Sequence, residues 1–333
     1  DPSLSKRRVV ITGMGIVSPV GSRLADAWST VCEGNSGISL IDDFDVSGFP
    51  TRIAGQVKDF DVDSYLSSKA QRQNDPFVHY GVAATVDAIQ DAGLEITEEN
   101  GHLIGVAMGA GIGGIKYIED NHNKMLQGGP RKVSPFFIPG SIINMISGQV
   151  SILQHITGPN LSIVTACATS THCIGLAARS IEHGDAEVML AGGAEFATTP
   201  LAMAGFCSAR AMSTRNDDPT GASRPYDTGR DGFVLSNGAG CVVLEEYEHA
   251  RSRGAQIYAE LIGFGMSGDA YHVTLPLADG EGARKCMAAA MRDAGIEPSD
   301  VDYLNAHGTS TPAGDVGETI GIKRAFDGAA ADL

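Results

Sequence analysis

The chain lacks any long uninterrupted hydrophobic segment, and its start carries no secretory signal. None of its apolar runs reaches the roughly eighteen residues that a membrane-spanning helix needs. We therefore expect no membrane span and no membrane partner. Strict short repeats and low-complexity segments are also absent. With 43% hydrophobic residues, the sequence is that of an ordinary globular protein.

Cysteine is scarce and scattered. The chain contains six cysteines, and none of them forms a CxxC pair or a spacing typical of metal ligands: Cys32, Cys167, Cys173, Cys207, Cys241 and Cys286. Most of them lie in apolar runs, which is typical of reduced thiols in a cytoplasmic protein. We predict a cytoplasmic location and no metal site.

Positive charge is also in short supply. Lys and Arg number 24 against 40 Asp and Glu, which gives a formal net charge of −16. A polyanion repels a chain of this charge, so nucleic acid is excluded as a general partner.

Strand-like apolar runs alternate with helix-like segments along the chain, a pattern that favours an α/β fold with a covered, largely parallel sheet. The expected strands are 8–12, 103–108, 161–165, 188–191, 241–244 and 301–304. The expected helices are 24–32, 80–92, 168–182, 282–294 and 316–326. Gly34 and Gly93 mark helix ends, since glycine is the preferred C-cap. The length of 333 residues suggests two domains or one large α/β unit.

Two strand-end segments carry reactive side chains. Residues 165–170 (TACATS) place Cys167 between a strand and a helix, where unpaired N–H groups and the helix dipole favour a thiolate. Residues 307–315 (HGTSTPAGD) place His307 in a second segment of the same kind. A thiol and an imidazole at strand ends suggest acyl transfer, although a lone cysteine is more often a core residue.

These segments resemble the β-ketoacyl-acyl-carrier-protein synthases, the condensing enzymes of fatty-acid synthesis. The resemblance runs from residue 7 to the end of the chain, and the motifs keep the family's order. Besides the two segments above, it rests on 7–13 (RRVVITG), 129–137 (GPRKVSPFF) and 230–235 (RDGFVL).

The resemblance implies the thiolase fold, two similar βα halves in α-β-α-β-α layers. We expect an N-terminal half at 1–254 and the start of a C-terminal half at 255–333. The family's later Lys-Ser-Met-Thr-Gly-His and Gly-Phe-Gly-Gly-Thr-Asn motifs are absent, and His272 does not replace their histidine. The second half is therefore expected to be truncated, with the sequence covering the first four-fifths of an enzyme.

The resemblance also assigns roles to residues. Cys167 is the expected nucleophile, with its own N–H in the oxyanion hole, and His307 is the first active-site histidine. Thr309 and Thr311 alternate along an extended loop, so their hydroxyls face the same side. The resemblance implies that they hold the phosphopantetheine arm. A helix cap is the alternative role for both threonines.

Further residues would shape the acyl pocket. Phe233 matches a residue beside the nucleophile, and Asp231 matches a buried member of an ion-pair network. Ile112 matches the pocket gate, and Phe137 matches a residue that reaches the partner subunit of a homodimer, although both also suit a protein core. Cys173 and His172, in the helix after the nucleophile, are predicted to be packing residues.

The expected partner is the acyl carrier protein, which delivers both acyl and malonyl groups and brings the phosphopantetheine with it. No other cofactor is expected. Since carrier proteins are acidic, docking would need local cations within a negative chain. Five match the family's docking positions, although any of them also suits an ordinary solvated surface: Lys69, Arg72, Arg131, Lys132 and Arg210.

Several types of synthase remain open. Residues 307–309 argue against the initiating type, which uses Cys-His-Asn. Residues 95–100 (EITEEN) and 134–139 (SPFFIP) look like the type II elongating synthase, whereas 168–173 (ATSTHC) is closer to type I. We predict type II. A non-catalytic dimerising module that binds carrier protein, similar to a chain-length factor, is the alternative of a different class.

Overall fold

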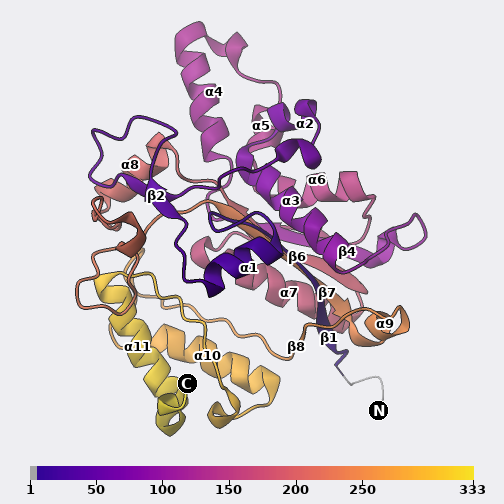
Figure 1. The fold of residues 1–333 in the computed structure, drawn as a ribbon. Helices are drawn as coiled ribbons and strands as arrows, with labels where there is room; N and C mark the ends of the chain where they lie inside the picture. The colour runs from indigo at the N-terminus through magenta and orange to yellow at the C-terminus, as the bar shows by residue number, and fades with distance from the viewer. Residues whose placement is uncertain (1–5) are drawn as a thin grey trace. The chain divides into compact units, whose positions relative to one another are not determined.

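The computed structural model describes residues 6–333, which divide into two compact units (Figure 1). The sheet unit comprises residues 6–38, 55–203 and 236–261. The second unit comprises residues 39–54, 204–235 and 262–333. Each unit is thus assembled from separate stretches of the chain.

A six-stranded sheet in the order β5-β4-β6-β7-β1-β8 forms the centre of the sheet unit. Its strands are β1 (Val9–Val17), β4 (Ile104–Gly109), β5 (Asn160–Leu161), β6 (Val188–Glu195), β7 (Gly238–Glu246) and β8 (Ala259–Leu261). Within the described residues, the β4–β5 and β4–β6 pairs of this sheet are parallel, and the β6–β7, β7–β1 and β1–β8 pairs are antiparallel. The prediction of a largely parallel sheet is therefore wrong. To make a parallel pair, the chain must cross over to the end of the sheet where the first strand began. The long segment between β6 and β7 instead enters β7 at the end where β6 finishes, so the two strands are antiparallel.

The fifth strand is shorter than predicted. Residues 161–165 were expected to form a strand, but only Asn160 and Leu161 pair with β4. Beyond them the hydroxyl of Ser162 donates to the Met108 carbonyl at 2.7 Å, where a backbone N–H would otherwise continue the ladder. The chain thus leaves the sheet edge before it reaches Cys167.

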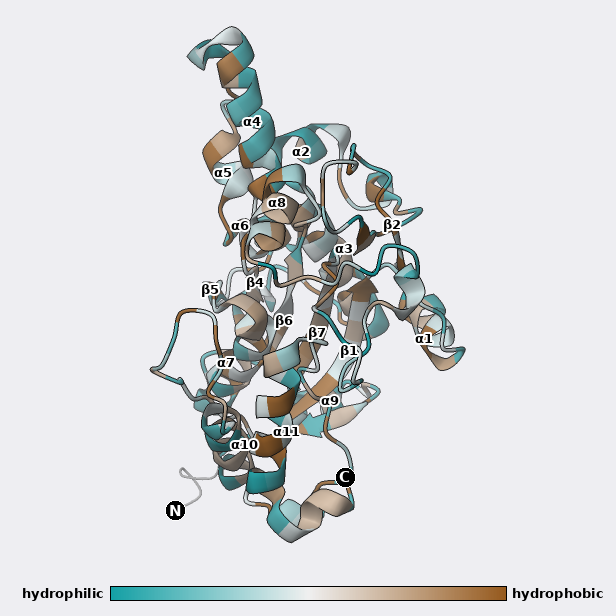
Figure 2. Ribbon diagram, turned by 90° about the vertical axis from the view of Figure 1, so that its left-hand side faces the viewer, coloured by the Kyte–Doolittle hydropathy of each residue, from teal (hydrophilic) through white to brown (hydrophobic). Residues whose placement is uncertain are grey.

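Helices cover both faces of this sheet. The helices of the sheet unit are α1 (Leu24–Cys32), α2 (Ser68–Gln73), α3 (Pro76–Asp91), α4 (Ile115–Gly128), α5 (Phe137–Ser141), α6 (Met145–Gln154), α7 (Thr169–His183) and α9 (Tyr247–Ser252), and α8 (Pro200–Ser208) crosses the boundary between the units. Helix α1 has the predicted bounds, and the predicted glycine ends are confirmed, since Gly34 and Gly93 have φ of +71° and +56°. Figure 2 shows α4 as mostly hydrophilic, whereas the central strands are paler and browner.

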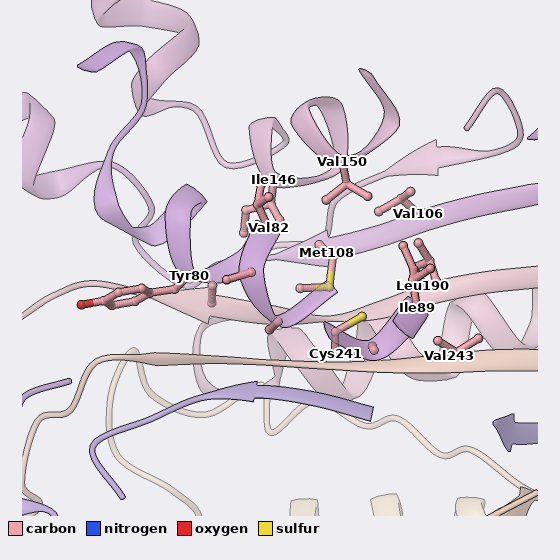
Figure 3. Close-up of a cluster of buried hydrophobic side chains, with 14 of the residues drawn as sticks. Tyr80, Val82, Ile89, Val106, Met108, Ile146, Val150, Leu190, Cys241 and Val243 are labelled. Atoms are coloured by element: carbon pink, nitrogen blue, oxygen red, sulfur yellow. The ribbon is translucent and has the colours of Figure 1, made fainter. Parts of the chain in front are cut away.

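Alternation along the strands divides the core into two clusters. On one face, Val106 and Met108 of β4 and Leu190 of β6 pack against α3 and α6 (Figure 3). On the other face, Ala107 and Met189 pack against α7. Successive strand residues point to opposite faces, so both faces of β4 and β6 are buried.

A buried carboxylate ties the sheet to α9. Glu245 of β7 is fully buried and lies 2.6 Å from both Arg253 Nε and His249 Nδ1, while Thr12 Oγ1 donates to it at 2.7 Å. Burial alone would raise the pKa of this carboxyl, but the surrounding donors outweigh it and lower the pKa. The charge is therefore retained inside the unit by its partners.

The second unit contains little sheet. Strands β2 (Ile38–Leu40) and β3 (Ile53–Gly55) pair at its boundary, and α10 (Glu281–Ala294) packs on α11 (Pro312–Phe326). Gly280 makes the helix contact possible, since a Cβ there would lie 2.2 Å from the Gly317 carbonyl oxygen. The predicted strand at 301–304 is wrong. Apolar residues alone do not make a strand, which needs a backbone partner, and no ladder pairs with this segment in the described chain.

Candidate active site

The segment before α7 forms a sharp turn that presents Cys167. Ala166 has a φ of +50°, a left-handed conformation that costs a non-glycine residue on the order of 1 kcal/mol. Thr169 Oγ1 accepts the Thr165 N–H at 2.9 Å, and the Ala168 N–H donates to the Thr165 carbonyl at 3.1 Å. Cys167 is exposed at this turn. Strain held by local hydrogen bonds, directly before a helix N-terminus, is the expected geometry for a nucleophile.

The two residues of α7 predicted to pack behave differently. Cys173 is fully buried against the sheet, and burial raises the pKa of its thiol, so the packing role is confirmed. His172 instead lies with Nδ1 2.8 Å from Thr165 Oγ1. The prediction for His172 is wrong, because its ring is one turn into the helix and reaches back to the loop that carries Cys167.

Burial makes two other cysteines harder to ionise. Burial raises the pKa of Cys241 to about 12 and also raises the pKa of Cys286. Only Cys32 and Cys167 are exposed, and Cys32 is the last residue of α1. A helix favours an anion at its N-terminal end and not at its C-terminal end, so the two exposed thiols occupy opposite electrostatic settings.

A glycine loop lies against the Cys167 turn. Gly111 is so close that an added Cβ would come within 3.4 Å of Ala166 Cα. Its neighbour Ile112 is 41% exposed. The carboxylate of Glu195, at the end of β6, accepts the N–H groups of Gly111 and Ile112 at 2.8 Å and that of Gly113 at 3.0 Å. The predicted gate residue is thus next to the nucleophile turn, on a loop fixed by a carboxylate.

In the second unit, Glu318 anchors the His307 loop. Its carboxylate accepts the His307 and Gly308 N–H groups at 2.6 and 2.8 Å, and the Tyr226 hydroxyl donates to it at 2.8 Å. Burial, followed by the hydrogen bond to Glu318, raises the pKa of Tyr226, so this phenol remains a donor. The backbone carrying the predicted histidine is therefore held by a side chain of α11.

A second carboxylate completes this anchor. Asp315 is 2% exposed and accepts the Tyr226 N–H at 2.8 Å and the Ser310 N–H at 3.1 Å, with Arg230 Nε 3.4 Å away. Ser310 has a φ of +66° and its carbonyl accepts the Gly232 N–H at 2.9 Å. These contacts join the 307–311 loop to the 224–232 loop within one unit.

Thr309 and Thr311 lie side by side. Their hydroxyl oxygens are 3.1 Å apart, so the prediction that they share one side of the loop is confirmed. Helix α11 has no side-chain cap from Thr311, which removes the alternative role for that residue. Their contact with a phosphopantetheine arm stays a prediction.

The predictions for Phe233 and Asp231 compare differently with the structure. The Phe233 ring packs edge-on against Phe206 at 5.3 Å between centroids, and its place beside Cys167 stays a prediction. Asp231 pairs with Arg224 at 3.3 Å, as predicted, but its side chain is 35% exposed and not buried. The 224–231 loop lies at the surface, so one side of this carboxylate remains open.

Four of the five predicted docking cations lie in the sheet unit. Lys69 and Arg72 belong to α2, and Arg131 and Lys132 belong to the short 3-10 turn Pro130–Lys132. The Tyr117 hydroxyl donates to the Arg72 carbonyl at 2.9 Å and is hydrogen-bonded to the Ser134 hydroxyl at 3.0 Å, which draws the two segments together. All four side chains are exposed, as is Arg210 in the second unit, and none of the five pairs with a carboxylate among residues 6–333.

Sequence reasoning missed Glu195, Asp315 and Glu318. The last two lie in the first turns of α11, where a carboxylate can reach back toward the preceding loop, and that position was the available signal. Glu195 acts on residues 84 positions earlier, which no local pattern reveals. No cluster of three or more His, Cys, Asp or Glu able to hold a metal occurs in the described chain, and none of its helices is suited to crossing a membrane.

Comparison with known proteins tests the class of the molecule. The family model for the beta-ketoacyl synthase N-terminal domain matches residues 6–250, and that for the C-terminal domain matches 258–332. The 3-oxoacyl-[acyl-carrier-protein] synthase 2 of Vibrio harveyi is 60% identical over 97% of this chain and 78% of that protein.

Solved structures agree. A beta-ketoacyl synthase from Burkholderia phymatum has a TM-score of 0.87 and 36% identity, covering 96% of this chain and 78% of its own. A type II polyketide ketosynthase, solved with its acyl-carrier protein, has a TM-score of 0.89 and 32% identity, covering 98% and 79%.

These similarities, with a cysteine at a strained turn above a helix-covered sheet, define a thiolase-fold condensing enzyme. The chain belongs to the beta-ketoacyl synthase family. The predicted fold and the resemblance to type II elongating synthases are confirmed.

Proposed function

We propose that the chain is an elongating β-ketoacyl-acyl-carrier-protein synthase of type II, which joins an acyl group to malonyl-carrier protein in fatty-acid synthesis. The observation that carries this proposal is Cys167, exposed at the strained turn directly before α7. Family membership and 60% identity to a type II synthase support the same reaction.

In the first step, the Cys167 thiolate attacks the thioester carbonyl of an acyl-carrier protein. The bond to the carrier sulfur breaks, the carrier thiol leaves with a proton, and the acyl group remains on Cys167 as a thioester. A thiolate both attacks and leaves readily, which suits an intermediate that must be formed and broken. The Cys167 N–H is one donor for the oxyanion of the tetrahedral intermediate.

In the second step, malonyl-carrier protein loses carbon dioxide and its enolate attacks the acyl carbonyl. The new carbon–carbon bond forms as the Cys167 thiolate is expelled, so the negative charge passes from the malonyl carboxylate to the sulfur. His307 donates a hydrogen bond to the malonyl thioester oxygen as the enolate develops. Thr309 and Thr311 bind the phosphopantetheine arm, and Phe233 shapes the site.

Acylation gives a direct test of this function. The full-length protein, incubated with radiolabelled acyl-carrier protein, is expected to gain one acyl group on Cys167 and, with malonyl-carrier protein, to release 3-oxoacyl product. Cys167→Ser is expected to abolish both, because an alkoxide is harder to form than a thiolate. A wild-type protein that binds carrier protein without acylation would instead be a non-catalytic module.

The carrier protein is proposed to dock on the basic patch, defined as Lys69, Arg72, Arg131 and Lys132, with Arg210 as a further cation. Two observations support this role. Tyr117 links the two segments that carry the patch, and no cation of the patch pairs with a carboxylate among residues 6–333. The related ketosynthase solved with its acyl-carrier protein adds support by similarity. Since phosphopantetheine arrives with this partner, the reaction needs no other cofactor.

We also propose a homodimer. The strand β5 forms an edge of the sheet and contacts α6, and exposed apolar side chains occur on α4, α5 and α6. An edge strand next to exposed apolar side chains is a typical self-association surface. Phe137 would reach the partner from this surface, and sedimentation is expected to give a dimer at micromolar concentration. The exposed apolar residues are Ile118, Met125, Leu126, Phe136, Ile138, Ile142, Ile152, Leu153 and Val164.

The remaining parts of the proposal concern organisation. We place the protein in the cytoplasm, in line with its few, scattered cysteines, which form no CxxC pair. We keep the family halves at 1–254 and 255–333, supported by the two family models that meet between residues 250 and 258.

A further inference from the structure

The loop that carries Ile112 is held in an unusual way. Three successive N–H groups, those of Gly111, Ile112 and Gly113, point at the single carboxylate of Glu195. Oε2 accepts the first two and Oε1 accepts the third, so both oxygens are used. Hydrogen bonds to a charged acceptor are roughly twice as strong as neutral ones, so this carboxylate fixes the loop backbone.

Glu195 has no other evident task. It pairs with no Lys or Arg among residues 6–333. It ends β6, whose preceding residues are buried in the sheet, so its own backbone is rigid. Burial raises the pKa of its carboxyl against the lowering effect of the three N–H groups. Burial of a carboxylate costs free energy, and here the three loop N–H groups are its partners. We therefore assign Glu195 the task of holding this loop in place.

Close contacts hold the loop on its other sides. A Cβ on Gly111 would lie 2.9 Å from Glu195 Oε2 and 3.4 Å from Ala166 Cα, so the loop is confined between the carboxylate and the residue before Cys167. Downstream, the Gly114 N–H donates to the Ser141 carbonyl at 3.1 Å. The backbone of Ile112 therefore has a position set jointly by Glu195, the Cys167 turn and Ser141.

We propose that Glu195 is a positioning residue that sets the width of the acyl entrance beside Cys167 by fixing the backbone of Ile112. This inference rests on the proposed function and on the prediction that Ile112 is the gate of the acyl pocket. It assigns acyl-chain selectivity to a carboxylate that need not touch the substrate.

The test compares acylation of Cys167 by a short and a long acyl-carrier protein, with six and sixteen carbons, in the full-length protein. In Glu195→Gln the amide cannot accept at both positions, and the loop is released. The ratio of the long-chain to the short-chain kcat/KM is expected to rise about tenfold or more, the scale of one charged hydrogen bond. Alkylation of Cys167 by iodoacetamide, which needs no acyl entrance, is expected to change less than about twofold.

Matched variants separate positioning from general damage. Asp91→Asn removes a carboxylate that accepts a backbone amide elsewhere, the N–H of Met14 in strand β1 at 2.9 Å, and is expected to keep the wild-type ratio. Gly111→Ala would place a Cβ 2.9 Å from Glu195 Oε2, so the loop and the carboxylate must move apart while the carboxylate stays intact. It is expected to reproduce the raised ratio, which keeps the test decisive if Glu195→Gln does not fold. The double variant Ile112→Ala with Glu195→Gln is expected to have nearly the same chain-length ratio as Ile112→Ala alone.

The outcomes are distinct. An unchanged ratio in both Glu195→Gln and Gly111→Ala, with wild-type acylation intact, would overturn the role of Glu195 and leave the proposed function standing. Equal loss for both chain lengths would make Glu195 merely structural. A wild-type protein that takes up no acyl group on Cys167 would overturn the proposed function and this inference together.

Discussion

The two units hold their reactive residues by different means. In the sheet unit, the turn that carries Cys167 lies between α7 and a sheet whose two faces are both packed with apolar side chains. In the second unit, the loop that carries His307 is held by two carboxylates of α11, Asp315 and Glu318. The nucleophile turn, with its own local hydrogen bonds, is carried by a sheet and a helix that are packed hydrophobically, whereas the histidine loop depends on a polar network.

Because the supports differ, mutations that weaken them should have different effects. A packed core is lost cooperatively, so weakening the sheet unit should affect every property of the protein together. A polar anchor can be removed locally, because the loop it holds has little packing of its own. The predictions below separate these two kinds of support, starting with the largest expected effect.

Removing the buried ion pair of the sheet unit should destabilise the whole protein. In Arg253→Met the Glu245 carboxylate keeps its burial but loses its closest cation, at 2.6 Å. The free energy of unfolding, measured by urea denaturation, is expected to fall by about 3–5 kcal/mol. Arg251→Met, which breaks an exposed pair with Glu248, is the control and should change little. A small effect of Arg253→Met would mean that water reaches Glu245.

Loosening the His307 loop should instead separate the two chemical steps. In Glu318→Gln the amide group opposes one of the two loop N–H groups, so His307 shifts. Condensation is expected to slow about ten- to a hundredfold, while acylation of Cys167 stays within about threefold. Asp302→Asn, an exposed carboxylate in the same segment, is the control. Equal slowing of both steps would contradict separate support for the two residues.

The sheet unit should also show a pH dependence from Asp75. This carboxyl is fully buried, accepts the Phe77 and Tyr117 N–H groups, and has a pKa raised to about 7, mainly by burial and further by Glu195. Because the folded state binds the proton more tightly than the unfolded chain does, this group makes stability fall as pH rises from about 4 to 7.

Asp75→Asn removes this titration. The decrease in unfolding free energy between pH 5 and pH 8 is expected to become shallower by on the order of 2–3 kcal/mol. Asp91→Asn, at an exposed carboxylate hydrogen bond, should leave the slope unchanged. If the slope of Asp75→Asn equals that of the wild type, Asp75 is ionised throughout this range.

The smallest effect concerns the basic patch. With a net charge of −16, the chain repels an acidic carrier at long range, so docking must rest on nearby cations. Charge reversal at Arg131 and Lys132 is expected to raise the KM for acyl-carrier protein severalfold and to leave turnover of a short pantetheine thioester unchanged. Added salt should weaken only the carrier reaction, since screening at ~0.15 M acts over about 8 Å.

The same reversal at Arg292 and Lys323, two exposed cations of the second unit, is the control for altered net charge. Their variant is expected to keep the wild-type KM. Loss of activity toward both substrates after reversal in the basic patch would mean that these residues support the fold.

Each helix predicted from local patterns is present, but others, among them α4 and α6, were not predicted, and the sheet was predicted less well. Helix α1 was placed correctly because its apolar spacing and the glycine that follows it, Gly34, lie within one short stretch of sequence. The expected strand at 301–304 carries equally clear apolar residues but finds no partner strand, and strand formation depends on a partner that the segment itself does not contain. The antiparallel direction of β7 depends in the same way on how a long segment returns to the sheet.

In the candidate site, too, local motifs could be predicted and contacts between distant segments could not. Cys167, His307 and the two threonines lie in short motifs, so the sequence located them. Glu195 and Glu318 act through the backbone N–H groups of other segments, and a carboxylate on a helix or strand end looks the same whether it faces solvent or a loop. Their roles required the folded structure.

The central claim is that the turn before α7 activates Cys167, and alkylation measures it most directly. Folded full-length protein is treated with limiting iodoacetamide at neutral pH, and labelling of each cysteine is followed by peptide mapping. Cys167 is expected to react well before the other five cysteines, including the exposed Cys32, and acyl-carrier protein should protect it. Equal labelling of Cys32 and Cys167, without protection, would contradict the account.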